Sequence, residues 1–280
     1  MTDAEGLVDR LAEHWRPADI TWFADDAYPL VGVPGGEEAL EAWRQLYDLR
    51  SDLGRYPVLV GTQRDIDIQY DSYSYSESSP AEILAEANAF YARLQDPPTE
   101  RPSPSVAELH EELRQDVGNA GAWERYGAAA EEEMLVDAFG PLVSYDEWPV
   151  VAPAGGITIP FDILTREPHP EVFIALLDVD HPWEVFAHLK FGAFNACPFP
   201  SRHVAWWRYW YEHYDPQIVG VTFATVEAWV GEPPATREEA LRLAMQQFGY
   251  CNDIVYQGVG SVEALAATLL GGVSWYFWWD

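Results

Sequence analysis

The feature that most constrains this chain is its last stretch, residues 274–280, in which five consecutive residues are aromatic. No glycine or proline interrupts the run, and aromatic residues suit the pleated surface of a sheet, so the stretch predicts a β-strand. Alternation places Trp275, Phe277 and Trp279 on one face and the even-numbered rings on the other. Because both faces are aromatic, we expect helices to cover one and a second unit or a partner to cover the other.

Composition places the chain among globular proteins. Its 280 residues are 48% hydrophobic and 14% aromatic, which is ample for a large core and favours two units over one. No apolar run approaches the roughly 18–20 residues of a membrane span, and the acidic residues 1–5 do not have the layout of a signal peptide. Two cysteines, Cys197 and Cys251, are too few for a disulfide framework. We therefore expect a cytoplasmic protein with reduced thiols and no membrane contact.

The formal net charge is −30. It is uneven: residues 1–170 hold 11 basic and 33 acidic side chains, and residues 171–280 hold 5 and 13. A field of this sign repels nucleic acid and anionic membranes, and it speeds association with a basic protein. We therefore predict no nucleic-acid partner and a basic protein as the candidate partner. Plain solubility is the alternative, as is a salt-adapted or GC-rich source, since Lys190 is the single lysine beside 15 arginines.

The first 168 residues are predicted to form an acidic α+β unit. Residues 65–71 alternate acidic and apolar side chains, which predicts a strand with a solvated carboxylate face rather than a row of metal ligands. Prolines make residues 96–104 the clearest linker. The other predictions are helices near 5–15, 37–53, 105–117 and 121–138, and strands within 19–33, at 56–61, at 142–143, at 148–151 and within 157–164.

Residues 169–280 are predicted to form a second α+β domain. Apolar runs predict strands at 172–177, 217–223, 226–230 and 274–280, with helices at 182–190 and 200–214, one opened by a capping box at Thr236 and one from Ser261. The resulting β-α-β-β-α-β order suits a two-layer, ferredoxin-like sheet. That arrangement would make the C-terminal strand central.

Two loops carry the candidate chemistry. Cys197 precedes a predicted helix whose first turns contain His203, and Cys251 and Asp253 follow the end of the next long helix. If both loops lie at the same end of the sheet, these four side chains meet. The chain has no phosphate-binding glycine loop, no Gly-x-Ser-x-Gly motif and no paired CxxC that would indicate a different site.

Three interpretations of this cluster remain open. Thiolate, imidazole and carboxylate together could bind zinc, although one cysteine per loop is a weak zinc pattern. Cys197 could be a nucleophile with His203 as its base and Asp253 orienting the ring. The favoured interpretation is structural: buried cysteines and a hydrogen-bonded histidine that hold the loops. No metal and no cofactor are predicted; the catalytic candidates are Cys197, His203 and Asp253, and the binding candidates are Asn195, Cys251, Gln257 and Trp278.

Several segments of the C-terminal part resemble a known family. They are Asn195-Ala196-Cys197-Pro198, His203, Arg208-Tyr209-Trp210, Pro233 to Ala240, Tyr250 to Val255, Gln257-Gly258 and Trp275 to Asp280. Together they resemble the bacterial, largely actinobacterial, domain of unknown function 4253 over roughly residues 171–280. This chain has Asn252 where that family usually has proline, and Ala224-Thr225 where it often has an acidic turn. The resemblance implies membership in an uncharacterised bacterial family, without an activity or a catalytic residue.

Three functions are compatible with these features. The first is a non-enzymatic, acidic binding protein that holds a basic protein, as an immunity protein holds a toxin, with tryptophan and tyrosine side chains as anchors. The second is a small hydrolase or transferase that uses Cys197, His203 and Asp253, which requires Cys197 and His203 to lie within about 8 Å of each other. The third is a structural subunit of a larger assembly.

Overall fold

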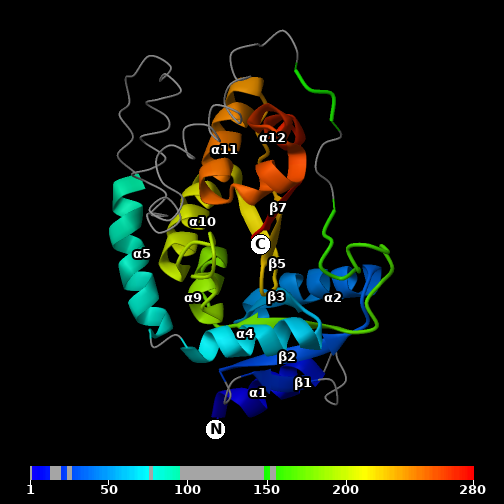
Figure 1. Ribbon diagram of the computed structural model, residues 1–280. Helices are drawn as coiled ribbons and strands as arrows, with labels where there is room; N and C mark the ends of the chain where they lie inside the picture. Colours follow the sequence, from blue (N-terminus) through cyan, green and yellow to red (C-terminus); the bar gives the residue numbers. More distant parts are fainter. Residues whose placement is uncertain (1, 13–19, 24–26, 76–77, 95–147, 152–155) are drawn as a thin grey trace.

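The computed structural model describes residues 2–12, 20–23, 27–75, 78–94, 148–151 and 156–280 (Figure 1). In this part of the chain the strands form one seven-stranded mixed sheet of order β1-β2-β4-β3-β5-β6-β7. The strands are β1 (Ile20–Phe23), β2 (Tyr28–Val33), β3 (Tyr56–Gly61), β4 (Val172–Leu177), β5 (Pro216–Val221), β6 (Thr225–Val230) and β7 (Ser274–Trp278). The helices are α1 (Thr2–Ala12), α2 (Glu37–Asp48), α3 (Arg50–Leu53), α4 (Gln63–Tyr75), α5 (Pro80–Leu94), α9 (Val185–Leu189), α10 (Pro200–Tyr214), α11 (Arg237–Tyr250) and α12 (Val262–Leu269). A 3-10 helix, η3 (Pro182–Glu184), and a π-helix, η4 (Ile254–Val259), complete them.

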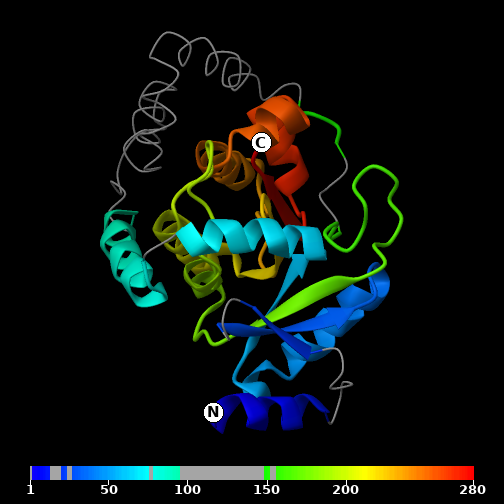
Figure 2. The same ribbon diagram turned by 60° about the horizontal axis from the view of Figure 1, so that its bottom comes forward.

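The sheet runs through both predicted units. Strand β4 lies between β2 and β3 and is antiparallel to both, and β3 is parallel to β5 (Figure 2). The first strand of the predicted C-terminal domain is therefore surrounded by strands from the N-terminal part. The α+β class is confirmed, whereas the division at residue 168 stays a prediction across a continuous sheet.

The predicted central position of the C-terminal strand is wrong. Strand β7 pairs antiparallel with β6 and is the last strand in the sheet. In a ferredoxin-like sheet the last strand would lie beside the first, which here is β4. Both edges of β4 are already occupied, by β2 and β3, so β7 has no place there. The β-α-β-β-α-β order along the chain is present, but the ferredoxin-like arrangement is not confirmed.

Each face of the sheet packs a separate core. On one face, α5 and α9 to α12 enclose an aromatic core whose fully buried side chains include Trp207, Trp210 and Trp275. Figure 1 shows α10, α11 and α12 gathered on this side. On the other face, α1 and α2 cover the strands β1 to β4, together with Ile157 and Ile159. Five of the chain's thirteen tryptophans are buried in this aromatic core.

The alternation predicted for β7 is confirmed on one face only. Trp275, Phe277 and Trp279 are buried together in the aromatic core. On the opposite face Tyr276 is 37% exposed, so the second cover that we predicted does not reach it. The helices that cover this face, α1 and α2, pack on the strands at the opposite edge of the sheet from β7.

Three predicted strands are not strands in the structure. Residues 65–71 belong to helix α4, where the Asp65 carboxylate accepts hydrogen bonds from the backbone and hydroxyl of Thr62 at the helix start. Ile66 and Gln69, three residues apart, are its buried positions, a helical spacing that the acidic alternation hid. Residues 157–164 form turns with one isolated bridge, from Phe161 to Pro168, and residues 148–151 are irregular.

The other predicted elements agree with the structure or lie outside it. The helices near 5–15, 182–190 and 200–214, the strands at 56–61 and 172–177 and the capping box between Thr236 and Glu239 are confirmed, and 37–53 is divided into α2 and α3. The linker at 96–104, the helices at 105–117 and 121–138 and the strand at 142–143 lie outside the described residues. In the described part, no helix has the length and hydropathy of a membrane span.

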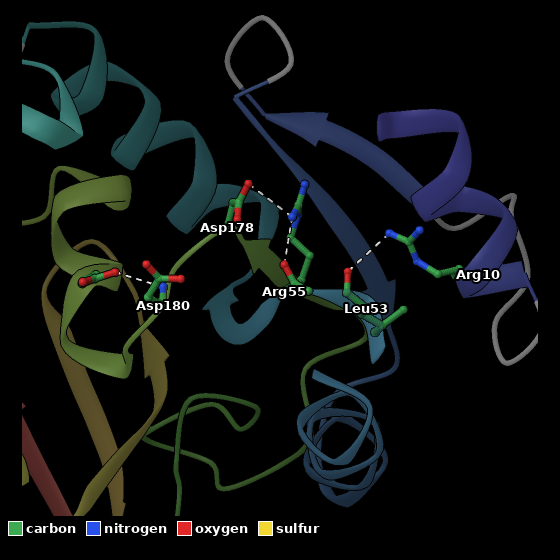
Figure 3. A network of polar contacts seen from close by, with 7 residues as sticks. Arg10, Leu53, Arg55, Asp178 and Asp180 are labelled. Atoms are coloured by element: carbon green, nitrogen blue, oxygen red, sulfur yellow. Dashed lines mark hydrogen bonds and ion pairs between the residues drawn. The ribbon is translucent and has the colours of Figure 1, made fainter. Parts of the chain in front are cut away.

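Polar contacts join helix α1, strand β3 and strand β4 at one end of the sheet. Arg55 immediately precedes β3, and its guanidinium lies 3.3 Å from the carboxylate of Asp178, which immediately follows β4 (Figure 3). Arg10 of α1 reaches the carbonyl oxygen of Leu53 at 3.4 Å. These contacts attach α1 and the β3–β4 pair to each other at the same end of the sheet.

Candidate functional site

The structure brings Cys197 and His203 into contact, as the catalytic interpretation requires. Helix α10 begins at Pro200, so His203 lies in its first turn, and its Nε2 atom is 3.4 Å from the Cys197 sulfur. Both residues are buried. Gly192 permits this approach with a φ of +114°, because a Cβ there would lie 2.8 Å from the same Nε2 atom.

A chain of hydrogen bonds fixes the hydrogen on the His203 ring. The His203 ring has a hydrogen bond with the Pro198 carbonyl, which only accepts, so a ring N–H must donate it. Because Nδ1 contacts the Tyr250 hydroxyl, we assign this N–H to Nε2. Nδ1 of the neutral ring is then an acceptor, and the Tyr250 hydroxyl donates a hydrogen bond to it. The Tyr250 oxygen in turn accepts from Nε1 of Trp207 at 2.8 Å. The donor direction is therefore Trp207 to Tyr250 to His203.

The tautomer of His203 in this chain of hydrogen bonds does not suit a Cys–His catalytic pair. The nitrogen that faces the Cys197 sulfur already holds a hydrogen, so it cannot accept the thiol proton in this tautomer. Burial lowers the pKa of His203 from 6.5 to about 3 and raises the pKa of the Cys197 thiol well above its usual value. Both groups are therefore neutral at pH 7, unlike the thiolate and imidazolium of an activated cysteine.

Asp253 is not the partner of His203. Its Oδ2 accepts the backbone N–H of Asp280 at 3.1 Å, and its Oδ1 accepts from Gln257 Nε2 at 3.2 Å. Its negative charge adds to the burial that raises the pKa of Cys197, a direction unfavourable to a nucleophile. Tyr250 occupies the place that we predicted for Asp253. The sequence signal was one residue away from Cys251, but a tyrosine is a weak indicator because it is usually an aromatic core residue.

The remaining candidates bind the chain's own last residues. The side-chain amide of Asn195 donates to the Asp280 carbonyl at 2.5 Å, and the Cys251 thiol donates to the Trp278 carbonyl at 3.0 Å. With Asp253 on the Asp280 N–H, these contacts form what we call the C-terminal clamp: Asn195, Cys251 and Asp253, with Gln257 supporting Asp253. The two loops do meet at one end of the sheet, but they meet around residues 278–280.

The same contacts bear on the zinc interpretation. Among the described residues, no group of three or more His, Cys, Asp and Glu side chains is placed to hold a metal ion. Burial raises the pKa of Cys251 far above its usual value, and its sulfur still carries the hydrogen that it donates to Trp278. The four candidates are thus divided between the His203 chain and the C-terminal clamp.

Sequence reasoning missed a buried carboxylate, Glu227 of β6. It is 1% exposed and accepts the backbone N–H groups of Thr158 and Ile159 at 2.8–3.0 Å and the Thr158 hydroxyl at 2.5 Å. Burial raises its pKa against the opposing effect of these donors. Ile159 also packs over Gly220, where a Cβ would lie 2.4 Å from its Cδ1 atom. No motif in the sequence links Glu227 to residues so distant along the chain.

The segment that Glu227 binds is attached to both halves of the sheet. The segment, residues 157–169, is called the strap. At its other end the Pro160 carbonyl accepts from the backbone of Gly36 at 2.9 Å, and the His169 carbonyl accepts from Gly35 at 3.1 Å. A Cβ on Gly35 would lie 2.2 Å from that carbonyl, so the close approach requires glycine. The strap joins β6 to the turn after β2.

Comparison with known proteins identifies the C-terminal part alone. No curated protein and no solved structure matches the chain. Residues 173–280, from β4 to the C-terminal clamp, match the family model described as Domain of unknown function (DUF4253), which confirms the resemblance for this part of the chain.

Proposed function

We propose that this protein is a non-enzymatic, acidic binding protein that holds a basic protein partner in the bacterial cytoplasm, in the manner of an immunity protein. The observation that carries the proposal is the net charge of −30. Such a field increases the association rate with a positively charged partner and disfavours nucleic acids and anionic surfaces.

The placement of the few cations supports this proposal. Of the five basic side chains in residues 171–280, four lie over aromatic rings of the preceding part, at 3.9–4.9 Å from the ring centroid: Lys190 over Tyr73, Arg202 over Phe90, Arg208 over Tyr91 and Arg237 over Trp148. The fifth, Arg242, pairs with Glu238 at 3.4 Å. Each positive charge of this part has a partner within the chain, which leaves the excess of carboxylates to act on what approaches from solvent.

The kinetic test uses the salt dependence of association. A partner captured at low salt is purified, and its association rate is measured in low and in physiological salt. We expect a partner of high isoelectric point and a rate that falls about tenfold or more, because exposed charges are screened beyond about 8–10 Å. An association rate that does not change with salt, or a neutral or acidic partner, would contradict the proposal.

A second candidate function, a small hydrolase or transferase, is favoured by one observation: the 3.4 Å contact between Cys197 and His203. Thiol labelling separates the two functions. A binding protein with buried, neutral thiols should react slowly with iodoacetamide at pH 7.5 and fully once it is unfolded. Rapid labelling of native Cys197, with loss of a hydrolytic activity in Cys197→Ser, would favour the enzyme instead.

A further inference from the structure

The outer edge of β7 has a definite set of unpaired backbone groups. Val230 N–H donates to the Val273 carbonyl at 2.9 Å, and Trp279 N–H donates to the Ala224 carbonyl at 3.1 Å. In an antiparallel ladder, hydrogen-bonded pairs alternate with non-bonded pairs, and Glu227 opposite Tyr276 is a non-bonded pair in this register. The odd-numbered residues of β7 therefore bond to β6, while the backbone groups of Ser274, Tyr276 and Trp278 point away from the sheet.

Part of this edge is closed and part is open. The outward carbonyl of Trp278 accepts the Cys251 thiol, and Ser274 is buried. Tyr276 is 37% exposed, and no hydrogen bond from its backbone to another described residue on the outer side is found. The groups that remain are the N–H and carbonyl of Tyr276 and the N–H of Trp278, beside two aromatic side chains on the uncovered face.

This edge lacks the usual protection against pairing. Edge strands are normally guarded by charged side chains, proline or a bulge, but Ser-Trp-Tyr-Phe-Trp contains no charge and no proline, and its register with β6 is regular. We propose that the open edge of β7, at Tyr276 and Trp278, accepts an extended, lysine- or arginine-rich segment of a partner protein as an added strand. This inference rests on the proposed function and states where the basic partner binds.

Charge selects this occupant over a second copy of the chain. Two copies would each bring a net charge of −30 to a shared edge. The carboxylates of Asp253 and Asp280 lie at the end of β7, where the cationic side chains of an added segment would be stabilised. In a strand, side chains alternate, so a segment with a cation at every second position fits one edge.

The test uses the full chain and a defined probe, a short end-blocked peptide of alternating lysine and valine. The control peptide has the same sequence with N-methyl groups on alternate residues, which removes its pairing N–H groups and leaves its charge unchanged. Hydrogen exchange of the native protein is measured with each peptide. We expect the amides of Tyr276 and Trp278 to gain protection with the first peptide and not with the second.

Two variants test the same edge by affinity. Tyr276→Pro removes one outward N–H and leaves the ladder to β6 intact, since that N–H does not bond to β6. Tyr276→Thr also removes the ring but keeps the N–H and the β propensity, so it is the matched control. We expect the proline variant to bind the peptide at least about fivefold more weakly than the threonine variant, from one lost hydrogen bond.

Each other outcome overturns the inference in a distinct way. Salt-sensitive peptide binding that protects a different segment, or equal affinity of the two variants, would place the basic partner elsewhere and leave the proposed function standing. A concentration-dependent dimer that Tyr276→Pro abolishes would assign the edge to a second copy. Absence of peptide binding together with a non-basic partner would overturn the edge and the proposed function together. Because the exchange measurement uses the native sequence, it decides the matter even if the proline variant fails to fold.

Discussion

Nδ1 of His203 accepts a hydrogen bond from the hydroxyl of Tyr250, so a neutral phenol stands where a catalytic triad would have a carboxylate. Because a phenol does not stabilise an imidazolium as a carboxylate does, the arrangement keeps the ring neutral. The surroundings agree with this: the rings of Phe186, Phe191 and Trp279 lie within 6 Å of the His203 ring. The hydrogen bonds from Trp207 to Tyr250 and from Tyr250 to His203 thus fix the positions of side chains inside the aromatic core.

The first prediction concerns the Tyr250 hydroxyl. Tyr250→Phe keeps the ring but leaves Nδ1 of His203 and Nε1 of Trp207 without partners inside the core. Unpaired buried polar groups cost about 1–3 kcal/mol, so the free energy of unfolding should fall by that amount in urea titrations. Tyr70→Phe, at an exposed ring, is the matched control and should change it little. Equal stability of the two variants would contradict the hydrogen-bond chain.

The second prediction concerns the pH dependence of stability. The folded pKa of His203 is about 3, below its ordinary 6.5, so between these values the unfolded chain binds a proton that the folded chain does not. The contribution of neutral His203 is complete above pH 6.5 and is lost as the pH falls toward 3, at about 1.4 kcal/mol per pH unit. Ring ¹⁵N shifts should show an Nε2–H tautomer at pH 7 and no protonation at pH 5. An imidazolium signal near pH 6 would contradict this assignment.

The third prediction concerns the strap. Glu227→Gln replaces one carboxylate oxygen with an amide NH₂, which would face the N–H donors of Thr158 or Ile159. We expect a loss of about 1–3 kcal/mol in the free energy of unfolding, with faster hydrogen exchange at both amides. Glu232→Gln, on the exposed turn after β6, is the control for the loss of one charge. Unchanged exchange at Thr158 and Ile159 would show that the carboxylate does not hold the strap.

The fourth prediction concerns the autonomy of the matched part. In a fragment of residues 171–280, strand β4 would lose both neighbours, β2 and β3, and β5 would lose β3. We expect this fragment to lack a cooperative thermal transition and the near-ultraviolet signal of packed tryptophans. The full chain is the control. Cooperative unfolding of the fragment would show that β5, β6 and β7 suffice and would favour the domain division at residue 168.

Local patterns predicted much of the C-terminal part. The capping box at Thr236 and the buried run of β4 depend on neighbouring residues and are found as predicted, and the alternation of β7 is found on the face that carries Trp275 and Phe277. The helix over residues 63–75 was mistaken for a strand because its polar residues alternate over a short window, while its buried positions follow the helical period. Short amphipathic segments are ambiguous in this way.

Long-range features could not be read in the same way. Strand β4 lies between β2 and β3 because their edges are free to pair with it, and the sequence of β4 itself does not indicate which strands will be its neighbours. The convergence of the two cysteine-bearing loops was predicted, but what they enclose was not. Asn195 and Asp253 were expected to face a ligand or a substrate, and they bind the backbone of Asp280. Asparagine, cysteine and aspartate serve equally well for either purpose.

The position of β4 also affects how the chain folds as it leaves the ribosome. Strands β2 and β3 cannot pair with their common neighbour until residues 172–177 have been made, long after β3 ends at Gly61. At a synthesis rate of about 5–20 residues per second, the edges of β2 and β3 that pair with β4 stay unpaired for roughly 5–20 s. During that time the nascent chain presents two unpaired hydrophobic strand edges, where we expect chaperones that act during translation to bind.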